Sequence, residues 1–239
     1  MKHPRMTLGI NFLEGRAQKL KLVLSYSILR KNLEIDSIII HPDYAPHSSS
    51  PPAYSQSDIA LLKLKAPLDL DKYVPACLPE RNRTFVGRTA WIYGWGNFIG
   101  RTEGPSSNIL RQTTGKVISW QNCRSAEHWP SGAGQKPLDK GFLCTLAEPL
   151  QYGTLRGVCA GDSGGPVTVQ QADGRQLLIG VISFTSPECG GVKYHLKFAA
   201  LFIHSIFFQP EADVHTDVSI FRNWIDREIE KHGEAKFCV

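Results

Sequence analysis

The chain has 239 residues, of which 42% are hydrophobic and 21% are charged, and it carries a formal net charge of +5. This length and composition predict a globular protein with a full hydrophobic core. The Lys and Arg residues are scattered and form no nucleic-acid-binding motif, which argues against a nucleic-acid partner. The sequence contains no cluster of metal ligands and no cofactor motif, so we expect neither a metal nor a cofactor.

The amino-terminal third of the chain is predicted to be β-rich. No apolar run of the length of a signal peptide follows residues 1–5. From about residue 8 to residue 70, short β-rich runs alternate with Gly, Pro and Ser clusters, a pattern typical of antiparallel barrels. Residues 58–64 read Asp-Ile-Ala-Leu-Leu-Lys-Leu and predict a strand that carries Asp58.

The most informative motif lies in the second half of the chain. Residues 161–166 read Gly-Asp-Ser-Gly-Gly-Pro, and Cys159 lies just before them. A serine hydroxyl is a weak nucleophile that needs a base beside it, and acyl transfer needs backbone N–H groups aimed at the developing oxyanion. Gly161 and Ser163 can supply two such N–H groups, because glycine adopts backbone angles that a side chain would forbid. The motif therefore indicates a nucleophilic Ser163.

Two segments stand out after this turn. Residues 192–209 form a mostly apolar stretch that is too short, and too interrupted by Lys and His, to span a membrane, which takes about 20 apolar residues. Between Phe221 and Ile229, apolar residues recur at helical spacing. They predict a helix over residues 219–233 with Ser219 as its cap.

Seven blocks, in order along the chain, resemble the chymotrypsin-like (trypsin-like) serine proteases. They are residues 38–44, 58–64, 75–79, 91–96, 161–166, 183–185 and 214–225. The resemblance implies an all-β fold of two antiparallel Greek-key β-barrels of the chymotrypsin type, the first incomplete, with a C-terminal α-helix. It also implies a monomeric serine endopeptidase that hydrolyses protein or peptide substrates, binds protein protease inhibitors and is extracellular.

The resemblance also sets the expected domain boundaries. One peptidase domain covers residues 1–233 and is followed by a tail. Its parts are residues 1–80 as the remnant of the first barrel, 81–218 as the second barrel and 219–233 as the helix, with the tail at 234–239. Residues 192–209 exceed the family spacing, and removing them restores it. We therefore interpret them as a retained intron or another aberrant insertion.

The resemblance assigns roles to the residues around the serine. Ser163 attacks the scissile carbonyl, the N–H groups of Gly161 and Ser163 hold the oxyanion, and Asp58 orients the general base. Asp162 corresponds to the carboxylate that pairs with the amine freed when a zymogen is cut. The Ala-Ala-His-Cys block that carries the base is absent, which leaves His3 as a candidate base. We expect the chain as written to be inactive.

The same resemblance predicts the substrate-binding residues. Gly157 takes the place at the base of the specificity pocket where most trypsin-like members have an aspartate. Ser183 supports Asp58 and, with Phe184, offers backbone to the substrate. Thr185 narrows the neck of the pocket, and Asp213 faces the pocket from the opposite wall or, alternatively, is a solvated loop acid. An acid in this wall favours a basic substrate residue, whereas the narrow neck favours a small one, and of the two we prefer the basic residue.

Six cysteines are typical of a secreted disulfide set. Four match two family bridges, Cys123 with Cys144 and Cys159 with Cys189. Ala90 and Val169 occupy both positions of a third family bridge, so its two partners are absent together. A bridge between Cys77 and Cys238 is possible.

Two other interpretations of the chain stay open. It is either a non-catalytic homologue that binds proteins through the same surface or an unstable fragment without a function. The intact Ser163, Asp58 and oxyanion turn argue against long-standing decay, because a binding module has no need of them.

Overall fold

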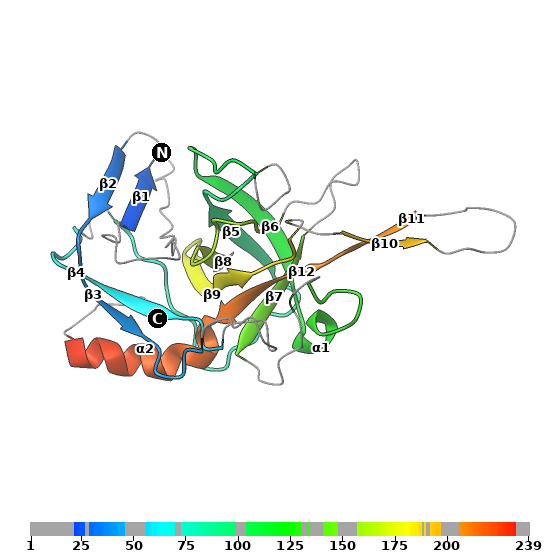
Figure 1. The fold of residues 1–239 in the computed structure, drawn as a ribbon. Coiled ribbons are helices and arrows are strands. Elements are labelled where there is room, and N and C mark those ends of the chain that lie inside the picture. The colour runs from blue at the N-terminus through cyan, green and yellow to red at the C-terminus, as the bar shows by residue number, and fades with distance from the viewer. Residues whose placement is uncertain are drawn as a thin grey trace, which may run out of the picture.

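The computed structural model describes residues 22–26, 29–45, 56–69, 73–98, 104–130, 133, 141–147, 157–187, 189, 192–196 and 206–232. These residues form a six-stranded closed barrel, three two-stranded sheets and a long helix near the carboxyl terminus (Figure 1). The arrangement confirms the predicted all-β class with a C-terminal helix. No helix within the described ranges is long and apolar enough to cross a membrane.

The barrel is entirely antiparallel. Its strands, in their order around the barrel, are β12 (Ala212–Asp217), β7 (Phe142–Ala147), β6 (Arg111–Ile118), β5 (Thr89–Gly94), β8 (Pro166–Gln170) and β9 (Gln176–Phe184). Pairing of β9 with β12 closes it. Because side chains alternate along a strand, every second residue points inward. Ile92, Val117, Val167 and Ile179 belong to the resulting core and are all less than 5% exposed.

Two buried apolar residues lie where the resemblance places a disulfide. Trp91 on β5 pairs with Thr168 on β8, so Ala90 and Val169 are the next residues along these two antiparallel strands. They are 0% and 1% exposed and belong to the same apolar cluster. At this point the core is held by packing without a covalent bond.

The described residues of the amino-terminal part form two small sheets. β1 (Leu22–Tyr26) pairs with β2 (Leu29–Leu33), and β3 (Ile35–Ile40) pairs with β4 (Ala60–Leu64), both antiparallel. The strand predicted to start at Asp58 starts at Ala60. Asp58 therefore lies in the connection that leads into β4.

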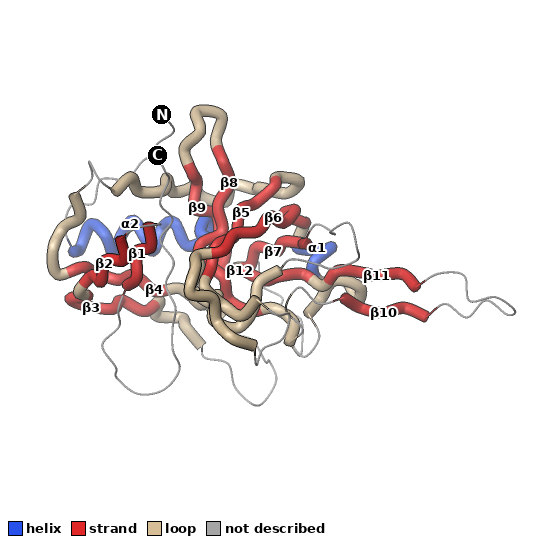
Figure 2. The backbone as a smooth tube through the Cα atoms, turned by 90° about the horizontal axis from the view of Figure 1, so that it is seen from above, coloured by secondary structure: helices blue, strands red, loops and turns tan. Residues whose placement is uncertain are grey.

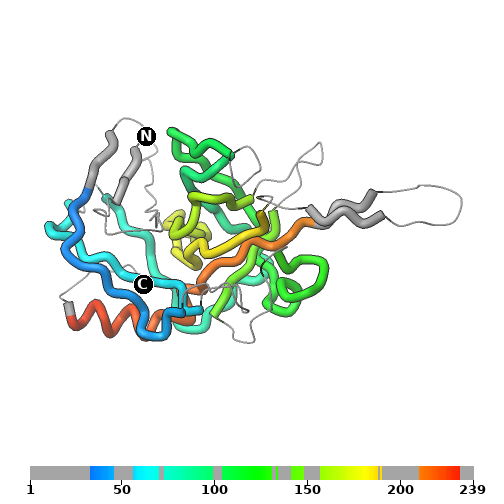
Figure 3. The backbone as a smooth tube through the Cα atoms, viewed as in Figure 1, coloured from blue at the N-terminus to red at the C-terminus, as the bar shows by residue number. Residues whose placement is uncertain are grey.

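Helix α2 (Val218–His232) packs beside the β3–β4 sheet although the two are far apart in the sequence (Figure 3). Ile59, Trp224 and Ile225 are buried in the cluster between them. The predicted cap is wrong by two residues: the carboxylate of Asp217 accepts hydrogen bonds from the Ser219 backbone N–H and hydroxyl. Asp217 was missed because either residue is a common helix cap.

The ends of the apolar stretch form a hairpin. β10 (Val192–Leu196) pairs with β11 (Ile206–Pro210) and projects away from the barrel in both Figure 1 and Figure 2. A single residue, Glu211, separates β11 from β12. Residues 197–205 lie outside the described part of the chain, and the interpretation of residues 192–209 as an insertion stays a prediction.

Both disulfides implied by the resemblance are present. Cys123, at the end of the short helix α1 (Trp120–Cys123), is bonded to Cys144 on β7, and Cys159 is bonded to Cys189. Cys77 is also disulfide-bonded, but its partner lies outside the described residues, as does Cys238.

Candidate active site

The predicted nucleophile lies in a tight turn just before β8. Gly161 and Gly164 have φ angles of 92° and 78°, the left-handed region that favours glycine. The Gly164 N–H donates to the Ile182 carbonyl at 2.8 Å, which ties the turn to β9. Ser163 itself is exposed. Within the described residues, the backbone N–H groups of Gly161 and Ser163 donate no hydrogen bond, so both are available to an incoming oxygen.

The Asp162 side chain points to two glycines, one at the end of β5 and one just after it. One carboxylate oxygen accepts the Gly96 N–H at 2.7 Å and the other accepts the Cys159 N–H at 3.0 Å. A Cβ atom at Gly96 would lie 2.6 Å from the Asp162 carboxyl carbon, and one at Gly94 would collide with the same group. The two glycines therefore create the space that this carboxylate fills.

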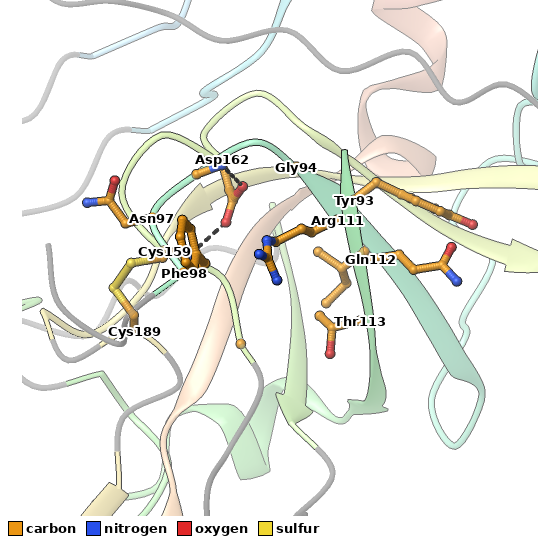
Figure 4. Close-up of a pocket in the computed structure, with 13 residues that line it drawn as sticks. Tyr93, Gly94, Asn97, Phe98, Arg111, Gln112, Thr113, Cys159, Asp162 and Cys189 are labelled. Atoms are coloured by element: carbon orange, nitrogen blue, oxygen red, sulfur yellow. Dashed lines mark hydrogen bonds between the residues drawn. A yellow bond between two sulfur atoms is a disulfide. The ribbon is translucent and has the colours of Figure 1, made fainter. Parts of the chain in front are cut away.

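Burial raises the pKa of Asp162, and its two backbone hydrogen bonds only partly oppose that shift. The residue borders a cavity of about 460 Å³, together with Gly157 and the Cys159–Cys189 disulfide (Figure 4). No Lys, Arg or His forms an ion pair with Asp162 in the part of the chain that the structure describes. Arg111 also lines the cavity, but its guanidinium lies 4.3 Å from the centre of the Phe98 ring.

Asp58 lies between the barrel and the β3–β4 sheet. Its carboxylate accepts the Ser183 hydroxyl at 2.7 Å, and its backbone carbonyl accepts the Thr216 hydroxyl at 2.7 Å. Ser57, immediately before it, has a φ of 46°. The two hydrogen bonds tie Asp58 to β9 and β12 of the barrel. Burial raises the pKa of Asp58, and the Ser183 hydrogen bond lowers it by less. The predicted contact between Ser183 and Asp58 is therefore present.

No described histidine is hydrogen-bonded to Asp58 or Ser163. His41 packs against the rings of Phe221 and Trp224 on α2, with ring centres 5.1 and 4.8 Å away, and burial lowers its pKa. His215 is fully buried in the barrel. The candidate base His3 lies outside the described residues.

Asp213 occupies the wall of the predicted specificity pocket. It is 2% exposed, which rules out the alternative of a solvated loop acid. One carboxylate oxygen accepts the Thr185 hydroxyl at 2.5 Å and the other accepts the Val158 N–H at 3.1 Å. Burial, assisted by the charge of Asp162, raises the pKa of Asp213 to about 7. Phe184 packs away from this pair, against the rings of Trp129 and Phe142.

Three contacts of the site were missed by the sequence reasoning. The first is the Thr185–Asp213 hydrogen bond, although each residue was identified separately. The second is the Thr216 hydroxyl on the Asp58 carbonyl, for which the sequence carries no signal. The third is His215, whose Nε2 lies 2.9 Å from the Thr145 hydroxyl. The signal in the sequence was a histidine between Val214 and Thr216, within the block at residues 214–225.

Comparison with known proteins finds a matching family and several serine proteases. The profile of the family described as Trypsin matches residues 21–204. Serine protease filzig of Drosophila melanogaster is 31% identical over 72% of this chain, which is 10% of the length of filzig. Serine proteinase stubble of the same organism is 33% identical over 61% of this chain, which is 17% of the length of stubble. Inactive CLIP domain-containing serine protease A28 of Anopheles gambiae is 29% identical over 68% of this chain, which is 39% of the length of that relative. The chain thus spans less than half the length of these relatives.

Proposed function

The chain belongs to the trypsin family, and on that premise we propose that Ser163 is the nucleophile of a peptide-hydrolysing site for which the described residues supply no general base. The observation that carries the proposal is the turn itself. It exposes Ser163, leaves its N–H group and that of Gly161 without a partner among the described residues, and is tied to β9 through Gly164.

In the proposed mechanism, the Ser163 hydroxyl oxygen attacks the carbonyl carbon of the scissile peptide bond. The N–H groups of Gly161 and Ser163 then stabilise the negative charge that develops on the carbonyl oxygen. The acyl-enzyme formed after the amine leaves is hydrolysed by water. Each step needs a base that takes the attacking proton and returns it to the leaving group.

Asp58 is the residue that would orient this base. Its carboxylate is fixed by Ser183 and its main chain by Thr216, so its position does not depend on the base being there. A positioned carboxylate holds an imidazole in the correct tautomer and stabilises the imidazolium. Losing the base of such a triad costs up to about 10⁶-fold in kcat, which is why we propose inactivity for this chain.

Asp162 is the proposed receptor for an activating amine. A buried carboxylate without a cation is costly, and the raised pKa of Asp162 reflects that cost. The neighbouring cavity of about 460 Å³ gives a positively charged amine room to approach. This pairing would stabilise the same turn that presents Ser163.

The proposed substrates are proteins or peptides, and the proposed location is extracellular. Two disulfides within the described residues support an oxidising compartment. We also propose that residues 1–233 act as one peptidase domain and that the chain is a monomer that protein protease inhibitors could bind.

A second candidate function is protein binding without catalysis. It is favoured by the absence of a described histidine at Asp58 and by the similarity to a relative named as inactive. Under this alternative the surface around Ser163 would bind partners, and the hydroxyl would have no chemical role.

Chemical rescue separates the two functions. Imidazole added to the full chain would supply a base that Asp58 can orient. We expect imidazole to accelerate labelling of Ser163 by a fluorophosphonate probe in a saturable manner, with no labelling in Ser163→Ala and loss of the acceleration in Asp58→Ala. Labelling that stays at background at every imidazole concentration would instead support the binding function.

A further inference from the structure

Thr185 and Asp213 meet across two strands that border the proposed active site. β9 and β12 are antiparallel, and Phe184 pairs with Val214. Thr185 follows Phe184 and Asp213 precedes Val214. Thr185 and Asp213 therefore face each other as the next pair of residues after Phe184 and Val214. Residues facing each other across antiparallel strands have their side chains in contact, and here the contact is a hydrogen bond of 2.5 Å.

Both oxygens of the Asp213 carboxylate already accept a hydrogen bond from the protein. Its second oxygen accepts the Val158 N–H, and Val158 follows Gly157 at the predicted base of the pocket. The carboxylate thus joins three segments: the one before the Ser163 turn, the start of β12 and the residue after β9. With 2% of its surface exposed, Asp213 fills the space between them.

We propose that the Thr185–Asp213 hydrogen bond closes the pocket beside Ser163, so that the site takes a small uncharged side chain before the scissile bond and excludes Lys and Arg. This inference rests on the proposed function and replaces the basic preference expected from Asp213 alone. A long cationic side chain would have to break two hydrogen bonds of a buried carboxylate before reaching it. With its pKa raised to about 7, Asp213 is also largely uncharged below neutral pH and then exerts little Coulomb attraction.

The test uses benzamidine, a small aromatic cation that complements a carboxylate at the bottom of an open pocket. Its binding needs no attack by Ser163 and can be followed by ligand-observed NMR at pH 8. We expect no saturable binding to the native chain and saturable binding to Thr185→Gly, which removes the closing side chain. Thr185→Ser keeps the hydroxyl and serves as the matched control that should stay closed.

Three further arms decide the outcome. Adding Asp213→Asn to Thr185→Gly should abolish the benzamidine binding that Thr185→Gly gains. If Thr185→Gly does not fold, Thr185→Ala takes its place. Saturable binding to the native chain that Asp213→Asn removes would overturn the proposal, as would a folded Thr185→Gly that binds no more tightly than the native chain. Because benzamidine binding bypasses acylation, a failure of imidazole to accelerate labelling of Ser163 would count against the proposed function and leave this result intact.

A second inference rests on a different part of the surface. Residues 82–84 read Asn-Arg-Thr, the acceptor sequence for N-linked glycosylation. All three are exposed, and Asn82 lies in a turn with a φ of 55°. The backbone N–H of Asn82 donates to the Ser219 carbonyl, which ties this turn to the start of α2. We propose that Asn82 is a site of N-glycosylation.

Expression of the full chain behind an export leader in insect cells tests this second proposal. We expect a mobility shift that peptide-N-glycosidase F removes and a glycopeptide that maps to Asn82. Thr84→Ser should keep the shift and Asn82→Gln should lose it. A secreted native chain without glycan would overturn the proposal.

Discussion

His215 should make stability depend on pH in a way that one substitution removes. Its ring is fully buried, Nε2 lies 2.9 Å from the Thr145 hydroxyl, and Nδ1 has no partner among the described residues. Burial lowers its pKa from 6.5 to about 3. Between pH 6.5 and pH 3 the unfolded chain therefore binds a proton at this position that the folded chain does not.

The sign and size of the effect follow from this difference in bound protons. Stability from His215 is complete above pH 6.5 and is lost as pH falls, by about 1.4 kcal/mol per pH unit. Over the whole interval the loss reaches about 5 kcal/mol. Asp213 acts in the opposite sense: with a pKa of about 7 it favours the folded state at low pH, and this contribution is lost as pH rises from about 4 to 7. In the native chain the two effects largely cancel.

His215→Gln isolates the histidine because Gln keeps a polar partner for Thr145 and does not titrate. Urea unfolding, followed by the fluorescence of the five tryptophans, gives the free energy of unfolding of both proteins from pH 4 to pH 8. We expect the native-minus-variant difference to fall by about 1.4 kcal/mol per unit below pH 6.5 and to be constant above pH 7. A difference that stays constant over the whole range would refute the assignment of His215 as a neutral buried group.

Two further predictions concern the packing around the site and the core. Gly96→Ala places a Cβ atom 2.6 Å from the Asp162 carboxyl carbon and should lower the free energy of unfolding by about 1–3 kcal/mol. Gly141→Ala is the control, because its Cβ atom meets only ordinary van der Waals contacts and should leave the thermal melt nearly unchanged. Joint substitution of Ala90 and Val169 by Cys should form a disulfide, detected by peptide mapping, and add about 2–4 kcal/mol in urea unfolding. Reduced thiols in the folded double variant would mean that the two positions are not close neighbours.

Local motifs predicted the parts of the structure that depend on short stretches of chain. The turn at Ser163 and the helix from Phe221 to Ile229 are examples, since glycine placement and helical spacing determine them directly. The disulfide pairs came from family resemblance, and the structure confirms Cys123–Cys144 and Cys159–Cys189.

Contacts between segments far apart in the sequence were harder to predict from the sequence. Asp213 was identified as a pocket residue, yet its burial depends on Val158 and Thr185, which approach it only when the barrel closes. The start of α2 was displaced because Asp217 and Ser219 are both good caps, and only the folded backbone selects between them. The hairpin formed by β10 and β11 was missed although residues 192–196, Val-Lys-Tyr-His-Leu, alternate between apolar and polar, because residues 192–209 were interpreted as a whole, as an apolar insertion.

The rate at which a fluorophosphonate labels Ser163 in the full chain without added base shows whether the chain has a general base of its own. We expect the native chain to be labelled no faster than Ser163→Ala, because the serine keeps its proton when no imidazole lies beside Asp58. Rapid labelling that maps to Ser163 and disappears in Ser163→Ala would show that the chain supplies its own base, and the proposed inactivity would then be wrong.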